Sequence, residues 1–341
     1  MHSWIKKILL TSFWGILALI WVVMIVFYFQ GSRPASDDSH ATIFEVQPGM
    51  TLKQVAVELS SLGLILSPSA FQAIAYIQDK ETQVMVGEYS LSPAMLPTEI
   101  ILRITSGKTV PHPVTIPEGF RITEIAALLH KHGLADPDVF IRHTQDKDLI
   151  RSLDVPTDSL EGYLFPETYH FSKFTPEIKI IRKMIDTFKE QTSKTQLLQI
   201  AKESSLSWHQ IITLASLIEK ETGLNSERKM ISSVFHNRLR KNMRLQTDPT
   251  VIYAIEKFDG NIRKRDLKID SPYNTYRYKG LPPGPIASPG IKSIIAAISP
   301  VESDRLYFVS RKNGSHYFSS TLTEHNQAVQ KYQLRRSNSR R

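Results

Sequence analysis

Two glutamates separated by one lysine close an apolar stretch of the sequence, ASLIEKETG at residues 215–223. A carboxyl group that holds its proton near neutral pH can protonate a leaving oxygen as a general acid. The same doublet can equally be the charged edge of a surface helix. On a regular helix, side chains two positions apart point about 200° apart, so Glu219 and Glu221 cannot act together on one bond.

The residues one turn earlier favour Glu219 as the working acid. Ala215 and Ser216 are small and leave room for a ligand beside Glu219, whereas larger aliphatic side chains precede Glu221. Apolar surroundings raise the pKa of a carboxyl group toward the range that suits a general acid. These residues alone leave a purely structural role for Glu219 open.

The helix that carries the doublet has a well-defined predicted start. Ser207 and Gln210 have the spacing of a capping box, in which each side chain satisfies a backbone N–H of the other residue. At helical spacing, the stripe that is expected to pack inward consists of Ile211, Leu214, Ala215, Ile218 and Thr222. Lys220 is expected to point away from this stripe into solvent.

Further polar and aromatic side chains follow in RLQTDPTVIYAI and in SPYNTYRYKGLPPGPIASPG. A capping role for Thr247 or Asp248 stays open, because a proline follows at a predicted helix start. The glycine- and proline-rich loop is stiff and suits the wall of a groove. Tyrosines at a strand edge need no ligand, but they can also hold sugar faces. We take six residues as candidates for substrate binding: Gln246, Thr247, Asp248, Tyr273, Asn274 and Tyr276.

Three other features are interpreted as structural. The aromatic motif LEGYLFPETYHF around Glu161 is typical of a core, although sugar stacking on it stays open. Asn313-Gly314 between alternating segments predicts a hairpin with a type I′ turn. His316 and His325 have no metal-ligand spacing around them, and no metal or cofactor is expected.

An uncharged apolar run occupies residues 8–29. About 22 residues at roughly 1.5 Å each cross a hydrocarbon core of roughly 30 Å, so we predict a single transmembrane helix. No small-residue cleavage site follows, which disfavours a signal peptide. Lys6 and Lys7 precede the run and predict a cytoplasmic N-terminus over residues 1–7, with the remainder outside.

The net charge of +9 does not indicate a nucleic-acid binder. Six of these charges lie in the membrane flank and in the basic tail, residues 334–341, which leaves +3 for the body. The chain contains no cysteine, so disulfide frameworks and thiolate metal sites are excluded. Residues 30–43 are small and polar, and we predict that they form a tether.

A strand, turn and helix pattern occurs twice, in FEVQPGMTLKQVAVELSSLGLI and in VTIPEGFRITEIAALLHKHGLA. Gly49 matches Gly119 and Gly63 matches Gly133, which predicts two copies of one unit. Two independent turns of similar chemistry stay open. The first copy, within residues 44–108, resembles the LysM module, a small glycan-binding βααβ unit. Met50 replaces the acidic residue usual there, so the resemblance implies the fold rather than sugar binding.

The long motifs together, from ASLIEKETG through SERKMISSVFHNRLRKNMRLQTDPTVIYAI to SPYNTYRYKGLPPGPIASPG, resemble the endolytic murein transglycosylase (YceG-like) family over most of residues 44–333. The resemblance implies an α+β fold with a single membrane helix, a LysM-like subdomain and a larger catalytic domain over residues 109–333. It implies Glu219 as the catalytic acid and base. The implied location is the outer face of the cytoplasmic membrane.

The implied reaction is cleavage of the bond between N-acetylmuramic acid and N-acetylglucosamine within peptidoglycan strands, leaving 1,6-anhydro ends and so ending strand growth. One acid suffices, because the muramyl 6-hydroxyl attacks its own C1. The expected partners are glycan strands, the membrane and peptidoglycan synthases, and no nucleic acid is expected. An inactive glycan-binding scaffold and a water-using muramidase remain alternatives.

Overall fold

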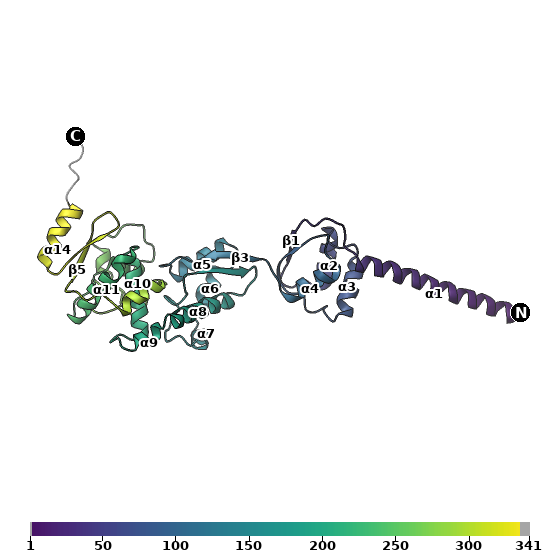
Figure 1. Ribbon diagram of the computed structural model, residues 1–341, viewed down its shortest axis with the longest axis horizontal. Helices are drawn as coiled ribbons and strands as arrows, with labels where there is room; N and C mark the ends of the chain where they lie inside the picture. Colours follow the sequence, from purple (N-terminus) through teal and green to yellow (C-terminus); the bar gives the residue numbers. More distant parts are fainter. Residues whose placement is uncertain (1, 335–341) are drawn as a thin grey trace, which may run out of the picture. The chain divides into compact units, whose positions relative to one another are not determined.

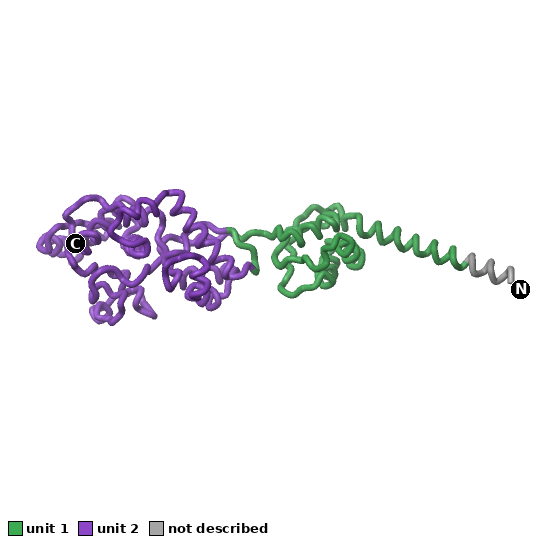
Figure 2. The backbone as a smooth tube through the Cα atoms, turned by 90° about the horizontal axis from the view of Figure 1, so that it is seen from below, with its two compact units in different colours: residues 1–112, 170–174 green, residues 113–169, 175–341 purple. Residues whose placement is uncertain are grey.

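The computed structural model describes the backbone of residues 2–334 and the side chains of residues 12–334. The predicted basic tail therefore lies mostly outside the described residues. The chain divides into two compact units, drawn in different colours in Figure 2. Unit 1 ends at His112 and also contains residues 170–174, whereas unit 2 comprises residues 113–169 and continues from Thr175. Helices and two-stranded sheets occur together, so the α+β class is confirmed.

The apolar run forms the long helix α1 (His2–Ser32), and its segment Ser12–Ser32 is long and apolar enough to cross a membrane. The helix continues past the predicted end at residue 29. The buried Gly31 contacts Ile74, and the Ala35 N–H then donates to the Pro93 carbonyl at 2.9 Å. The start of this segment thus contacts the rest of unit 1, whereas residues 36–43 are exposed, and the tether over residues 30–43 stays a prediction.

Unit 1 is a small α+β body. Its elements are β1 (Thr42–Val46), α2 (Leu52–Ser61), α3 (Pro68–Ile77), β2 (Gly87–Leu91) and α4 (Pro97–Ser106). β1 and β2 pair antiparallel, with Phe44 opposite Tyr89, and both rings are fully buried against the helices. The strand–helix–helix–strand order is the one that the LysM resemblance implies, and membership of that module stays a prediction.

Both predicted strand–turn–helix segments form, and their descent from one repeated unit stays a prediction. The first copy turns through Gly49 into α2, and the second turns through Gly119 into α5 (Ile122–Lys131); the φ angles of the two glycines are +84° and +80°, a region that disfavours other residues. In each copy, a side chain at the third helical position accepts the N-cap N–H at 2.8 Å. The two segments thus form the same local structure with different neighbours.

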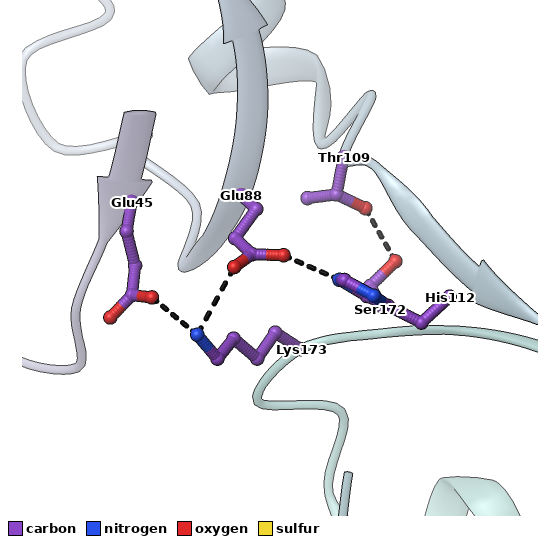
Figure 3. A network of polar contacts seen from close by, with 6 residues as sticks. All are labelled: Glu45, Glu88, Thr109, His112, Ser172 and Lys173. Carbon is purple, nitrogen blue, oxygen red and sulfur yellow. Dashed lines mark hydrogen bonds and ion pairs between the residues drawn. The ribbon is translucent and has the colours of Figure 1, made fainter. Parts of the chain in front are cut away.

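A polar network fixes two distant segments of unit 1 to the β1–β2 sheet (Figure 3). The Lys173 amine contacts Glu45 at 2.6 Å and Glu88 at 3.1 Å, and His112 also bonds Glu88. Thr109 and Ser172 share a hydrogen bond of 2.5 Å. Burial raises the pKa of Glu88, but its bonds to His112 and Lys173 outweigh burial, and the net pKa is lowered.

A second two-stranded sheet pairs β3 (Pro111–Thr115) with β4 (Thr168–Ser172), and the division between the units falls within both strands. Unit 2 then contains short helices α6 (Pro137–His143) and α7 (Lys147–Ser152), the long α8 (Glu177–Lys194) and α9 (Leu197–Ala201). Its second half comprises α10 (Trp208–Glu221), α11 (Asn225–Arg240), α12 (Asp248–Ala254), a 3-10 turn (Asp266–Lys268), α13 (Ile291–Ile298), β5 (Tyr307–Ser310), β6 (His316–Ser319), α14 (Leu322–Val329) and a π-helical end (Gln330–Leu334).

Helix α10 lies beside α11 in the second half of unit 2 (Figure 1). Its predicted capping box is confirmed: the Gln210 N–H donates to Ser207 Oγ at 3.3 Å, and Gln210 Oε1 accepts the Ser207 N–H at 2.9 Å. Every residue of 211–218 is buried, so the helix is enclosed all round rather than only along the predicted stripe. Helices α9, α11, α12 and α13 contact it.

The predicted C-terminal hairpin is confirmed, but the turn type is wrong. β5 and β6 pair antiparallel, with Phe308 opposite Phe318. The loop is closed by the Arg311 N–H donating to the Ser315 carbonyl at 2.8 Å, and positive φ angles occur at Lys312 and Gly314. A type I′ turn needs positive φ at both central residues, and Asn313 does not have it.

Candidate active site

The two glutamates at the end of α10 lie in different surroundings. Glu219 is packed into the protein: its side chain is 6% exposed, and so is that of its partner Arg228 on α11. Arg228 Nη2 donates to Glu219 Oε1 at 2.9 Å, and the Gly290 N–H donates to Oε2 at 2.9 Å. Both carboxylate oxygens thus have protein partners, one of them at the start of α13, where a helix favours negative charge.

A second carboxyl group lies against the same ion pair. Glu118 Oε2 accepts from Arg228 Nη2 at 3.4 Å, and its side chain is partly exposed. Burial raises the pKa of Glu118, and the neighbouring charge of Glu219 raises it further. A β-carbon on Gly290 would overlap the Glu118 carboxyl group, so this close approach requires glycine.

The small residues before Glu219 do not leave room for a ligand. Ala215 and Ser216 are fully buried, and Ser216 Oγ accepts the Ile286 N–H at 3.0 Å. The glycine- and proline-rich loop occupies this space, and the Gly119 N–H donates to the Ser288 carbonyl of this loop at 2.8 Å. The size argument that favoured Glu219 is therefore wrong, because a later segment of the chain fills the gap.

Glu221 faces the other way, into a cleft of about 300 Å³. The cleft is lined by Glu221 and by Gln246, Asp248, Tyr276, Phe308, Val309, Ser310, His316, His325, Val329 and Gln333. They come from the end of α10, the segment before and into α12, the tyrosine-rich loop, the β5–β6 hairpin and α14. Three of the six residues predicted to bind substrate thus line the cleft beside Glu221.

The environment of Glu221 suits a group that gives up and regains a proton. Burial raises the pKa of Glu221 to about 7, and the negative charge of Asp248 acts in the same direction. The Thr247 hydroxyl donates to Glu221 Oε1 and partly opposes the rise. A carboxyl group with a pKa near 7 holds its proton in about half of the molecules at neutral pH.

Thr247 is itself held in place by a small threonine cluster. The Thr247 N–H donates to Thr275 Oγ1 at 3.1 Å, Thr250 and Thr275 share a hydrogen bond of 2.8 Å, and all three residues are almost fully buried. Gln246, just before, has a positive φ of 53°, which costs free energy for a residue other than glycine. Strained backbone of this kind is common beside functional groups.

The remaining predicted residues have different roles. Thr247 is the N-cap of α12 but makes no side-chain capping bond, and Asp248 is the first helical residue rather than the cap. The Asp248 carboxylate accepts from the Tyr276 hydroxyl at 2.5 Å. Asn274 is fully buried, and its amide nitrogen donates to two backbone carbonyls of its own loop. Tyr273 packs against Tyr253, with ring centroids 4.8 Å apart. Asn274 therefore orders the loop, and neither residue lines the cleft.

Two histidines that were interpreted as structural line the cleft. His316 Nδ1 is 2.7 Å from the Glu227 carboxylate, which gives it a structural partner. His325 stacks on Tyr307, its buried Nδ1 has no partner among the described residues, and burial lowers its pKa so that the ring is neutral. No local signal could have placed them here, because the hairpin and α14 reach Glu221 only through the tertiary fold.

The core interpretation of the aromatic motif is supported by burial. Tyr163 is 1% exposed and its ring packs against Phe188. Glu161 is also buried, which raises its pKa to about 7, and it accepts the Ile122 N–H at 3.2 Å at the start of α5. Among the described residues, no group of three or more potential ligands could hold a metal ion.

A polar cleft bordered by a carboxyl group that holds its proton near neutral pH is a feature of enzymes that act on polar substrates. The YceG-like family model matches residues 44–331, and the chain belongs to this family. It is 38% identical to the endolytic murein transglycosylase of Bacillus subtilis (strain 168) over 88% of this chain and 87% of that one. It is 30% identical to the endolytic murein transglycosylase of Streptococcus pneumoniae (strain D39) over 83% of this chain, but spans only 57% of that protein.

A solved structure extends the similarity to the fold. The crystal structure of a putative YceG-like protein from Listeria monocytogenes aligns with a TM-score of 0.59 at 36% identity, over 85% of this chain and 99% of that one.

Proposed function

We propose that this protein is a lytic transglycosylase that cleaves peptidoglycan strands internally and leaves 1,6-anhydromuramyl ends. Family membership and two relatives named endolytic murein transglycosylases support the reaction class. The observation that carries the site assignment is the cleft in which Glu221 meets Gln246, Asp248 and Tyr276.

The reaction needs one group that first gives and then takes a proton. The protonated acid donates to the glycosidic oxygen, the bond to C1 breaks, and the muramyl 6-hydroxyl attacks C1. The carboxylate then accepts the proton of that hydroxyl, so no water is consumed. A pKa of about 7 allows Glu221 to serve in both directions near neutral pH.

The contacts favour Glu221 over Glu219 as this group. A carboxylate held by Arg228 and a helix N-terminus has both oxygens occupied and little access to a substrate. Glu221 has one observed donor, Thr247, and its carboxyl group borders the cleft. The assignment of Glu219 that the family resemblance implied stays a prediction, which substitution of each residue tests separately.

Helix α1 is the proposed membrane anchor of the protein. We assign its apolar segment to the cytoplasmic membrane as a single span, with the N-terminus inside and both units outside, where peptidoglycan lies. Cleavage there would end the growth of nascent strands, and peptidoglycan synthases are the proposed partners.

A second reaction is favoured by one observation. Asp248 lies in the same cleft as Glu221, and two carboxyl groups are what a water-using muramidase employs. Tyr276 donates to Asp248 and holds it in place. The two reactions differ in their product, because hydrolysis adds one water to the new end.

The test is the digestion of intact glycan strands by the full-length protein in detergent, followed by mass spectrometry of the ends. The proposal expects anhydro ends with the wild-type chain and their loss with Glu221→Gln. Reducing ends that are heavier by one water would establish the muramidase instead. An unaltered substrate with every variant, in a sample that binds glycan, would establish the inactive scaffold.

A further inference from the structure

The last turns of α1 pack directly on α3 of unit 1. Gly31 is buried, and a β-carbon there would lie 2.7 Å from Ile74 Cδ1 and 3.7 Å from the Ala70 side chain. Ala70 and Ile74 are one helical turn apart, so one face of α3 lies against α1. The absence of a side chain at Gly31 permits this close approach.

The last turn of α3 carries unusually exposed apolar side chains. Ile77 is 79% exposed, and its neighbour Tyr76 is 71% exposed. These are the most exposed large apolar side chains of the described part of the chain, above even those of α1. The charged residues 79–81 follow shortly after, so the apolar end of the helix is bordered by hydrophilic side chains.

The end of the membrane segment lies close to the contact between α1 and α3. Tyr28 stands three positions before Gly31, about 4.5 Å along the helix axis, and it is also largely exposed. Tyrosine is enriched where a membrane protein meets the lipid headgroups, because its ring is apolar and its hydroxyl is polar. The contact between α1 and α3 therefore lies within about one helical turn of the predicted boundary of the bilayer.

We propose that Tyr76 and Ile77 at the end of α3 insert into the interfacial layer of the membrane beside α1, so that unit 1 is docked on the bilayer surface. The partner of this apolar surface is lipid, because α1 packs on α3 and itself passes through the bilayer. The inference rests on the proposed anchoring by α1 and is independent of the catalytic assignment.

The chain contains no cysteine, so single cysteines can be labelled with a nitroxide without other changes. Three full-length variants are compared in nanodiscs that hold one copy each: Ile77→Cys, Val22→Cys within α1, and Val86→Cys at the exposed residue just before β2. Power saturation measures the access of oxygen, which dissolves in lipid, and of a nickel chelate, which stays in water.

The expected result is several-fold lower nickel access at position 77 than at position 86, with oxygen access at 77 between those of 86 and 22. Nickel access at 77 equal to that at 86, with position 22 protected, would overturn the inference while leaving the anchor intact. Water-like access at position 22 would overturn the anchor and the inference with it. Protection of position 77 in detergent, with spin–spin broadening between copies, would show a second chain as the occupant and also overturn it.

Discussion

Two glutamates on opposite sides of the end of α10 have different surroundings and therefore different roles. On one side, Glu219 is joined to Arg228 and to the N-terminus of α13, and the carboxylate connects three helices. On the other side, Glu221 has a hydroxyl donor and faces a polar cleft. A buried charge with full partners stabilises an arrangement, whereas a buried acid with few partners keeps its proton.

The different surroundings predict that Glu219 contributes to stability and Glu221 to the reaction rate, and both quantities can be measured. Removing the charge at Glu219 leaves the buried Arg228 without its nearest charged partner. At Glu221, the same substitution removes a group whose charged form is costly to bury, as its raised pKa shows. The same substitution, glutamate to glutamine, is therefore expected to have opposite effects at the two positions.

The largest expected effect is on the rate of Glu221→Gln. Loss of a general acid lowers the rate by about 10²- to 10⁴-fold, because glutamine cannot transfer the proton. Formation of anhydro ends from purified strands measures it, with folding checked by circular dichroism. The variant should also be at least as stable as the wild type above pH 7, where the wild-type carboxyl group must be charged in a buried site. Retention of the wild-type rate would exclude Glu221 as the acid.

The next effect is on the stability of Glu219→Gln. Breaking a buried ion pair by removing one partner costs about 3–5 kcal/mol, so the free energy of unfolding should fall by that order. Urea unfolding of unit 2 followed by tryptophan fluorescence measures it, with Glu118→Gln as a partly exposed control. The rate per folded molecule should change far less than in Glu221→Gln; a loss of rate without a loss of stability would restore Glu219 as the acid.

Thr247→Val should lower the rate on the order of tenfold and move its pH dependence. The hydroxyl that lowers the pKa of Glu221 is removed, so the pKa rises and the protonated form persists to higher pH. The fall in rate above pH 7 should therefore shift upward. Thr247→Ser keeps the hydroxyl and should restore both values. An unchanged pH profile in the valine variant would show that Thr247 serves packing only.

The smallest effect is expected in unit 1, at Lys173→Met. Its ion pairs with Glu45 and Glu88 are partly exposed and together contribute about 1 kcal/mol or less. The pKa of Glu88 is lowered, so its share of the stability is present at neutral pH and is lost as the pH falls below about 4.5. Thermal unfolding at pH 7 and pH 4 should show the wild type and the variant converging at the lower pH.

The order of local elements could be predicted from the sequence. The capping box of Ser207, the turns at Gly49 and Gly119 and the membrane-length helix depend on neighbouring residues, and each is present in the structure. The turn of the hairpin was mispredicted, because Lys312 and Gly314 adopt positive φ in a longer loop than the Asn-Gly pair suggested.

The candidate site was only partly predictable. Gln246, Asp248 and Tyr276 were identified by type, and they do line one cleft. Asn274 was of the right type but is enclosed by its own loop. His325 was dismissed, since nothing near it in the sequence indicates that α14 approaches α10.

The period of the α-helix alone determined that Glu219 and Glu221 point in opposite directions, and the apolar residues before them determined that the helix is buried. Which direction meets a packed wall and which meets a cleft was decided by Gly290, Thr247 and the β5–β6 hairpin. Those segments lie far along the chain, and their positions depend on the packing of the whole of unit 2. A carboxyl group acquires its proton affinity from such surroundings, so only the tertiary structure distinguishes the two glutamates.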